Sequence, residues 1–373
     1  MTAVDLAIVG GGIVGLAHAL AAARRGLSVT LLERDPGARR ASVRNFGFVT
    51  ITGQAAGETR RRAMRSREVW AEVAAEAGIA IVQRGALVVA RRAEAREVLA
   101  AYAAGPEGEG CELHDAAHAR KRWPALAPGL EAALWSPHEL RIESREAVPQ
   151  LARWLAERHG VRFLNGTAAL GIEKGGVRHA EGFVAAGRVV VATGDALAEL
   201  APALAREVRF RACRLQMLRT VPQPPAFRLP SVVMSDLSLM RYEGFAAQRP
   251  AARLRARLEA EAGEALREGV HLIVAQSADG SLVIGDSHEY GEAASPFSRE
   301  AVDALVLEEL DAVLAVPRPG IAARWAGVYP VSDTKPLLVR DLGDGARAVV
   351  VTSGTGMSTA FAIGEETVAA MFG

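Results

Sequence analysis

Residues 4–33 restrict the folds open to this chain more than any other segment. An apolar run at 4–9 predicts a buried strand, an alanine-rich stretch at 13–25 predicts a helix, and residues 29–32 predict a second strand. A glycine-rich turn joins the first strand to the helix. Strand, turn, helix and strand in this order form the βαβ unit that binds an adenine dinucleotide.

The glycines of the turn and the acid that ends the second strand have separate roles in such a unit. Gly10, Gly12 and Gly15 have the spacing G-x-G-x-x-G. Gly10 permits the tight turn, Gly12 lets the backbone approach a pyrophosphate, and Gly15 lets the helix pack closely on the strand. The helix points its positive N-terminus at the phosphates. Glu33 is placed to accept hydrogen bonds from both ribose hydroxyls, and its charge would repel the 2′-phosphate of NADP. NAD and FAD both satisfy the motif, but its place at the N-terminus and the segments that follow favour FAD.

Composition excludes several classes of protein. The 373 residues include 44 basic and 43 acidic side chains, and the net charge of +1 gives no reason to expect a nucleic acid or an anionic membrane as partner. No apolar run reaches the roughly 18 residues of a transmembrane helix. Cys111 and Cys213 lie far apart and outside any metal-ligand spacing, so we expect neither a disulfide framework nor a metal site. Because the chain runs straight into a strand, we expect no signal peptide and a cytoplasmic protein.

Segments typical of the nucleotide-binding fold recur along the chain. The apolar run 188–192 predicts a buried parallel strand, and 347–352 predict another before a final helix. Residues 167–173 and 177–184 predict a hairpin, and the charged residues 251–268 predict one solvated helix. We therefore expect an α/β protein in which a mainly antiparallel β substrate domain is inserted into a discontinuous, Rossmann-like FAD-binding domain. The FAD-binding domain is assigned residues 1–83, 142–208 and 322–373, and the substrate domain residues 84–141 and 209–321.

Five motifs spread over nearly the whole chain carry a family resemblance. They are the N-terminal G-x-G-x-x-G with Glu33, Ala41-Ser42-x-Arg44-Asn45-x-Gly47, Val190-Val191-Ala192-Thr193-Gly194, Trp325-x-Gly327-x-x-Pro330 and Ser353-Gly354-x-Gly356-Met357-Ser358. In combination they resemble the FAD-dependent D-amino acid oxidase superfamily, in its glycine oxidase and sarcosine oxidase branch. The resemblance implies that FAD lies extended in the first domain and that an amine substrate sits between the flavin ring and the antiparallel sheet. It also implies hydride transfer from an amine carbon to the flavin, hydrolysis of the imine, and O2 as the electron acceptor.

The N-terminal motif and the resemblance together give the residues expected along FAD. The segment 41–48 would run under the flavin ring, and the N-terminus of the last helix would face the flavin C2 carbonyl. The expected cofactor-binding residues are Gly10, Gly12, Ile13, Val14, Gly15, Glu33, Arg34, Ala41, Ser42, Asn45, Phe46, Gly47, Ala168, Thr193, Gly194, Gly354, Thr355, Gly356, Met357 and Ser358.

Three departures from the family pattern bear on the chemistry. Amino-acid-oxidising members carry an arginine just before the proline of the Trp-x-Gly-x-Arg-Pro stretch, where it clamps the substrate carboxylate, and here that residue is Tyr329. Sarcosine oxidases carry a lysine over the flavin, two residues before a strand-end glycine, where this chain has Val283 before Gly285. The linking cysteine of covalent relatives is missing from the C-terminal stretch, so we expect non-covalent FAD.

Other segments resemble a narrower branch of the family that is associated with phosphonate breakdown. These are Arg44-Asn45-Phe46-Gly47, Cys213-Arg214-Leu215-Gln216-Met217 and Gly285-Asp286-Ser287-His288-Glu289-Tyr290. Members of this branch are thought to oxidise amines of the 2-aminoethylphosphonate type, N-methylated forms included.

The resemblance therefore implies a substrate with an amine at one end and a phosphonate at the other. We expect its anionic group to be held by members of the set Arg44, Arg241, Tyr242, His288 and Tyr329. Arg241 and Tyr242 are interpreted as strand residues. His288 is a candidate to bind the anion or to orient the amine, and His288 and Tyr329 are the candidates for a catalytic role, although no side chain stands out as an obligatory base. His271, at the start of an apolar strand, is interpreted as structural.

Three other functions stay open beside an aminophosphonate oxidase. The first is a glycine or sarcosine type of oxidase, against which Tyr329 counts. The second is a flavin dehydrogenase that passes electrons to an acceptor other than O2. The third is a flavin-binding subunit without catalysis. The oligomeric state is not predicted.

Overall fold

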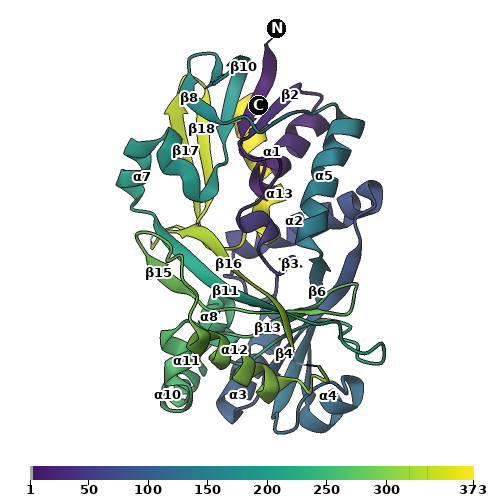
Figure 1. The fold of residues 1–373 in the computed structure, drawn as a ribbon. Coiled ribbons are helices and arrows are strands. Elements are labelled where there is room, and N and C mark those ends of the chain that lie inside the picture. The colour runs from purple at the N-terminus through teal and green to yellow at the C-terminus, as the bar shows by residue number, and fades with distance from the viewer. Residues whose placement is uncertain (1–2, 319, 334) are drawn as a thin grey trace.

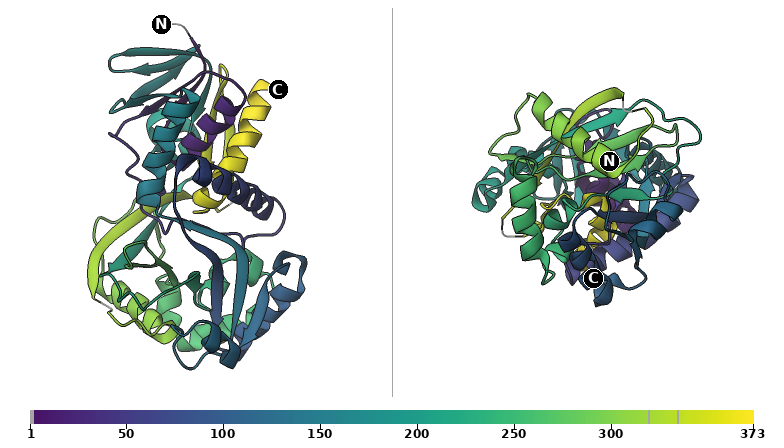
Figure 2. Two further views of the ribbon diagram at one scale, coloured as in Figure 1. Left: turned by 90° about the vertical axis from the view of Figure 1, so that its right-hand side faces the viewer. Right: turned by 90° about the horizontal axis from the view of Figure 1, so that it is seen from below.

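The computed structural model describes residues 3–318, 320–333 and 335–373. The chain forms two lobes, each built on one sheet, and both termini lie in the lobe with the parallel sheet (Figure 1). Figure 2 shows the helices of the other lobe gathered at the end of the molecule away from the termini.

The sheet of the first lobe has a parallel core. Its eight strands are β1 (Val4–Val9), β2 (Val29–Glu33), β7 (Arg162–Asn165), β8 (Ala169–Glu173), β9 (Gly176–His179), β10 (Gly182–Val191), β17 (Leu337–Gly343) and β18 (Ala346–Val351). β18, β10, β1, β2 and β7 lie side by side and parallel in this order, whereas β17 and the β8–β9 hairpin add antiparallel edges. The order reverses beside β1, so a crevice opens at the carboxyl end of β1, where such folds bind nucleotides.

Helices bury the parallel strands. The helices of this lobe are α1 (Ile13–Arg24), α2 (Glu58–Ala77), α5 (Ser144–His159), α6 (Leu197–Leu200), α7 (Pro202–Val208) and α13 (Gly356–Phe372), with single 3-10 turns η1 (Ala41–Val43) and η3 (Gly194–Ala196). The last helix packs on the first with almost no space between the backbones, because a Cβ on Gly364 would lie 2.7 Å from the Ala17 carbonyl oxygen. The N-terminal ends of α1 and α13, which come from opposite ends of the sequence, thereby flank the same crevice.

The second lobe is built on a ten-stranded sheet that is antiparallel except where β12 pairs with β4. Its strands are β3 (Phe48–Val49), β4 (Ile81–Ala90), β5 (Glu112–Asp115), β6 (Ala132–Ile142), β11 (Arg211–Thr220), β12 (Val232–Met234), β13 (Ile273–Gln276), β14 (Leu282–Gly285), β15 (Glu289–Gly291) and β16 (Ile321–Val331). Its helices are α3 (Ala93–Ala104), α4 (Ala116–Arg122), α8 (Ser238–Arg241), α9 (Glu243–Ala246), α10 (Ala251–Glu261), α11 (Gly263–Arg267) and α12 (Glu300–Val313), with the 3-10 turn η2 (Pro106–Gly108).

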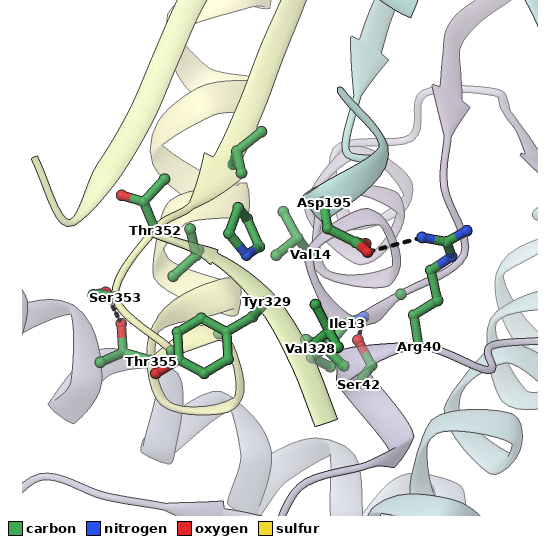
Figure 3. Close-up of a pocket in the computed structure, with 18 of the residues that line it drawn as sticks. Ile13, Val14, Arg40, Ser42, Asp195, Val328, Tyr329, Thr352, Ser353 and Thr355 are labelled. Atoms are coloured by element: carbon green, nitrogen blue, oxygen red, sulfur yellow. Dashed lines mark hydrogen bonds and ion pairs between the residues drawn. The ribbon is translucent and has the colours of Figure 1, made fainter. Parts of the chain in front are cut away.

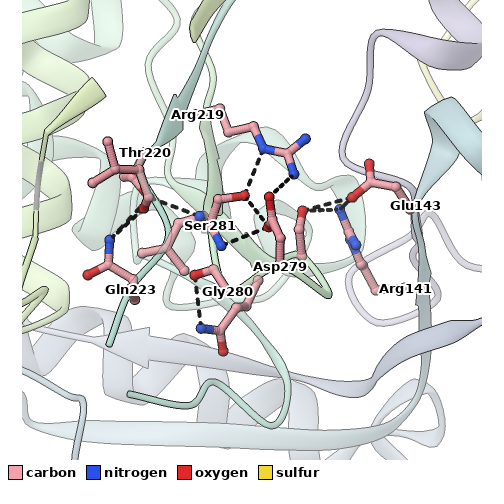
Figure 4. A network of polar contacts seen from close by, with 12 residues as sticks. Arg141, Glu143, Arg219, Thr220, Gln223, Asp279, Gly280 and Ser281 are labelled. Atoms are coloured by element: carbon pink, nitrogen blue, oxygen red, sulfur yellow. Dashed lines mark hydrogen bonds and ion pairs between the residues drawn. The ribbon is translucent and has the colours of Figure 1, made fainter. Parts of the chain in front are cut away.

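A polar network fixes the hairpin of β13 and β14 against β11 (Figure 4). Arg219 on β11 donates from Nε to Ser281 Oγ (2.7 Å) and from Nη2 to Asp279 Oδ2 (3.0 Å). Thr220 Oγ1 accepts from the backbone of Leu282 (2.9 Å). These bonds hold the turn of the hairpin, and thereby the strand that leads into the polar segment after Gly285.

The expected fold class is confirmed: a parallel, Rossmann-like sheet is combined with a second, mainly antiparallel sheet. The predicted hairpin of 167–173 and 177–184 is present as β8 and β9, but its second strand is shorter, because β9 ends at His179 and the chain turns before β10 begins at Gly182. One local prediction is wrong. Residues 251–268 form two helices, because the backbone leaves helical geometry at Ala262, with a φ of −132°.

Sheet membership also bears on the domain division. β16 pairs with β11 along its whole length, so residues 322–331 lie with the second sheet and not with the nucleotide-binding segments. The division that we propose therefore keeps the discontinuous arrangement, but it ends the substrate domain at Val331.

Candidate active site

One cavity of about 940 Å³ runs from the glycine turn after β1 to the face of the ten-stranded sheet. Its walls come from both lobes. All five expected substrate residues line it, and so do all the expected cofactor residues except Gly15 and Gly47.

Gly15 and Gly47 shape the cavity from behind its wall. A Cβ on Gly15 would lie 1.9 Å from the Gly10 carbonyl oxygen, so only glycine allows α1 to pack this closely on the turn. Gly47 has a φ of +68°, and a Cβ there would lie 1.8 Å from the Ile142 carbonyl oxygen. Both glycines therefore allow close packing of the backbone and do not themselves line the cavity.

The upper end of the cavity fits the adenosine and phosphate groups of a dinucleotide. Glu33 Oε2 accepts from the Gly11 amide (2.7 Å) and Oε1 from the Asp35 amide (3.0 Å), which orients the carboxylate and leaves a second lone pair on each oxygen. Thr193 Oγ1 lines the same region and is buried without a hydrogen-bond partner among the described residues. An orphaned hydroxyl at this place fits a polar ligand.

Two helix N-termini face the cavity. At the start of α1 the Ile13 amide donates to Ser42 Oγ (2.9 Å), so Ser42 joins the segment 41–48 to the phosphate end (Figure 3). No side chain of the described residues caps α13, whose first turn begins at Gly356 beside the cavity. The helix dipole favours negative charge at both ends, and the uncapped amides of α13 add to it there.

The segment 41–48 connects the two lobes. Asn45 uses both ends of its amide within the segment, because Nδ2 donates to the Ala41 carbonyl (2.8 Å) and Oδ1 accepts from the Gly47 amide (2.7 Å). The ring of Phe46 reaches the second lobe, where a Cβ on Gly285 would lie 3.3 Å from its Cζ atom. Asn45 therefore shapes this segment, and its side-chain amide keeps a second N–H and a second lone pair.

At the lower end an arginine and a tyrosine meet. Arg241 Nη2 donates to Tyr329 Oη (3.0 Å), and the Tyr329 ring lies against the backbone of Gly354. Figure 3 shows Tyr329 beside the loop of Ser353 and Thr355. Burial raises the pKa of Tyr329 well above 10, so its phenol stays neutral. The interpretation of Arg241 and Tyr242 as strand residues is wrong: Arg241 ends helix α8, and Tyr242 follows it.

Beside this pair lie His271, Asp286 and His288. Each of the three offers a ring nitrogen or a carboxylate oxygen, and these atoms lie within 4.8 Å of one another. Each residue is less than one-tenth exposed. His271 Nε2 is 3.0 Å from Asp286 Oδ1. Burial raises the pKa of Asp286, but the positive charge of Arg241 and the neighbouring His271 oppose this, and the pKa stays below its usual value. Burial lowers the pKa of His288 to about 3, although Asp286 opposes this shift, so His288 is neutral at pH 7.

This charge pattern bears on the expected anion contacts. A neutral His288 beside an ionised carboxylate does not attract an anion, so it is a poor anchor for a phosphonate. Arg44, Arg211 and Arg241 all line the cavity. Arg211 lies over the Tyr290 ring and pairs with Asp333. Arg241 is the cation that the structure places against Tyr329 at this lower end.

The sequence predicted a structural role for His271 and did not indicate that it lines the cavity beside Asp286. The backbone of His271 exchanges two hydrogen bonds with Asp286, His271 N to Asp286 O (3.1 Å) and Asp286 N to His271 O (2.9 Å). The available signal was the predicted pairing of 270–276 with 281–286, which brings the residues at the open end of the hairpin close together; in the structure Ile273 lies opposite Gly285. Cys111 and Cys213, both described, are not among the residues that line the cavity.

Comparisons with known proteins agree with this architecture. The family model described as FAD dependent oxidoreductase matches residues 5–370. The glycine oxidase of Bacillus cereus ATCC 14579 superposes with a TM-score of 0.79 at 18% identity, over 99% of this chain and 94% of that one. The glycine oxidase of Geobacillus kaustophilus gives 0.77 at 19% identity, over 100% and 95%.

A third solved structure holds the cofactor. The L-alpha-glycerophosphate oxidase of Mycoplasma pneumoniae, with FAD bound, gives a TM-score of 0.77 at 18% identity, over 100% of this chain and 95% of that one. At these identities the solved structures establish the fold alone. No curated protein matches the sequence. Within the described residues, no helix combines the length and the apolar character needed to cross a bilayer.

Proposed function

Because the chain belongs to the family of FAD-dependent oxidoreductases, we propose that it oxidises an amine that also carries an anionic group. The substrate that we propose is an aminophosphonate such as 2-aminoethylphosphonate or its N-methyl form. FAD, the cofactor of the family, supplies the two-electron oxidant for the carbon next to the nitrogen. We further propose that O2 takes the electrons and that FAD is held without a covalent bond.

One observation supports the proposal: Arg241 donates a hydrogen bond to Tyr329 at the lower end of the cavity. Tyr329 stands where amino-acid-oxidising relatives have their carboxylate-clamping arginine, and Arg241 reaches the same phenol from a different element, α8. A guanidinium binds a phosphonate through charge-assisted hydrogen bonds, and Tyr329 can donate its neutral O–H beside it. A phosphonate is tetrahedral and one carbon further from the amine than a carboxylate, which suits a displaced anchor.

The other residues act by position. The neutral Tyr329 adds a donor without a second charge, and the apolar wall of Phe46, Phe48 and Leu215 keeps water from the reacting carbon. Oxidation of an amine needs a fixed C–H bond and a dry site, and the enclosure by two lobes provides both.

The test is an anaerobic titration of the purified holoenzyme with 2-aminoethylphosphonate, its N-methyl form, glycine, sarcosine and ethylamine, followed by flavin absorbance. We expect the aminophosphonates to bleach the flavin and the others to do so far more slowly. Faster bleaching by glycine or sarcosine would favour the amino acid oxidase reading instead. Reoxidation in air with release of peroxide identifies O2 as the acceptor, and slow reoxidation without peroxide indicates a dehydrogenase.

A variant pair separates anion recognition from general damage. Arg241→Gln should raise KM for the aminophosphonate about 10–150-fold, the loss of one hydrogen-bonded charge, and leave ethylamine oxidation unchanged. Arg219→Gln, on β11 of the same sheet but at the β13–β14 turn, is the control and should change neither. Equal loss toward both amines in Arg241→Gln would contradict the proposed anchor.

A further inference from the structure

We propose that Tyr242, His271, Asp286, His288 and Tyr290 form the site that binds the ammonium end of the substrate, next to the Arg241 anchor for its anionic end. We call these five residues the ammonium site. The inference rests on the proposed amine oxidation, and it adds which residues hold the nitrogen and therefore how the substrate is oriented.

The first argument is an ionised carboxylate buried at the cavity. Asp286 is 4% exposed and lines the lower end of the cavity. A buried charge is costly unless it is paired. By hydrogen-bond geometry Asp286 Oδ1 has no partner among the described residues, although His271 Nε2 lies 3.0 Å away. The neighbouring Arg241 directs Nη2 to Tyr329 instead. The carboxylate is therefore available to a positive group that enters the cavity.

The second argument is a row of rings along the same wall. Tyr242 meets His271 edge-on at 5.9 Å between centroids, His271 stacks on His288 at 5.1 Å, and His288 stacks on Tyr290 at 6.3 Å. All four rings line the cavity. The Tyr290 ring already has the Arg211 guanidinium over it, with Cζ 5.6 Å from the ring centroid. Tyrosine faces beside a carboxylate attract an organic ammonium, and the apolar ring surface accommodates an alkyl group on its nitrogen.

The third argument is the direction of the imidazole lone pair of His288. His288 Nδ1 lies 3.0 Å from the Gly269 carbonyl oxygen, which can only accept, so Nδ1 carries the proton. In the neutral ring Nε2 then has the free lone pair. An N–H group of the substrate can donate to this atom while its charge faces Asp286.

The side chains of His271, Asp286 and His288 are also of the kinds that bind a divalent metal ion. Their surroundings, however, favour a monovalent organic cation. Arg241 lines the same space, interacts electrostatically with Asp286, and keeps its proton at all relevant pH values. Its charge opposes a divalent ion. A substrate that brings its own anionic group satisfies Arg241 and Asp286 together.

The experiment compares two ligands of nearly equal shape by anaerobic calorimetry. The probes are 2-aminoethylphosphonate and n-propylphosphonate, in which a methyl group replaces the ammonium, and the holoenzyme is reduced with dithionite so that no amine is consumed. We expect the aminophosphonate to bind about 10–150-fold more tightly, as for a hydrogen-bonded charge. In Asp286→Asn this advantage should disappear while propylphosphonate binding is kept.

Asp236→Asn is the matched control, because Asp236 is equally buried in the same lobe, pairs with Arg92 and does not line the cavity. It should keep the ammonium advantage. If Asp286→Asn fails to fold, the two affinities of the wild-type protein still test whether the ammonium group contributes to binding. His288→Gln is a second variant, and we expect it to lose part of the ammonium advantage.

Each outcome has a defined meaning. Equal affinities of the two ligands for the wild-type protein, or no binding of either, overturn the inference. Cobalt(II) absorption bands that appear in the wild-type protein and vanish in Asp286→Asn overturn it in favour of a metal site. If the ammonium advantage is present and is lost in Asp286→Asn, but no amine bleaches the oxidised flavin, the ammonium site stands and the proposed oxidation falls.

Discussion

Replacing Glu33 by glutamine tests whether the upper end of the cavity holds the ribose of FAD. In the structure both carboxylate oxygens accept backbone N–H groups, from Gly11 at 2.7 Å and Asp35 at 3.0 Å. A glutamine has one acceptor oxygen, so its NH2 group must face one of these donors. The ribose hydroxyls would also lose a charged acceptor. One charge-assisted hydrogen bond contributes about 1.5–3 kcal/mol, so the Kd for FAD should rise about 10–150-fold.

The assay is a titration of apo-protein with FAD, followed by quenching of flavin fluorescence. A thermal unfolding curve of each apo-protein separates weaker binding from weaker folding, because the lost backbone contact also lowers stability. Glu157→Gln, on the exposed side of α5, is the control and should bind FAD like the wild-type protein. A Glu33→Gln apo-protein of normal stability that binds FAD within twofold of wild type would refute the ribose contact.

Three further predictions concern other parts of the chain. Tyr329→Phe removes the acceptor of the Arg241 hydrogen bond and should raise KM for the aminophosphonate about 2–12-fold; unchanged steady-state kinetics would remove this phenol from the site. His18 is fully buried, and burial lowers its pKa to about 4, below the 6.5 of the unfolded chain. Its unfolded form therefore binds the proton first, and the stability present above pH 6.5 is lost as the pH falls, by about 2 kcal/mol between pH 7.5 and 5. His18→Leu should lose that much less in urea unfolding, and equal losses in both proteins would contradict the argument. Gly364→Ala places a Cβ 2.7 Å from the Ala17 carbonyl oxygen and should cost about 1–3 kcal/mol in thermal unfolding; a stable variant would show that α1 and α13 can separate freely.

The nucleotide-binding half could be predicted from the sequence because its signals are local. The apolar run of β1, the glycine turn and the apolar strand before Glu33 are contiguous, and each element is decided by the side-chain periodicity of its own residues. Glycines at the turn are required by backbone contacts only a few residues apart, as Gly15 shows against Gly10. These patterns lead to a dinucleotide site before any distant contact is known.

Local signals failed where two interpretations were equally compatible with the same residues. Alanine and charge continue through 251–268 without a break, so composition does not indicate that the helix stops at Ala262. The strand β16 was likewise assigned to the FAD-binding domain, although it pairs with β11 of the second sheet. Nothing in residues 321–331 indicates that their partner strand lies about a hundred residues earlier in the chain.

The lower end of the cavity was decided by tertiary structure. Arg241 comes from the end of α8, His271 precedes β13, Asp286 follows β14, and Tyr329 lies on β16. Their meeting depends on the register of the ten-stranded sheet, and register is set by contacts between strands and not by the pattern within one strand. The same packing buries Asp286 and His288 and thereby determines which of them is charged. Sequence alone thus determined that the chain binds a dinucleotide, because that site is built from neighbouring residues. The group of charged side chains that would select the substrate comes from distant segments, so only the tertiary structure brings it together.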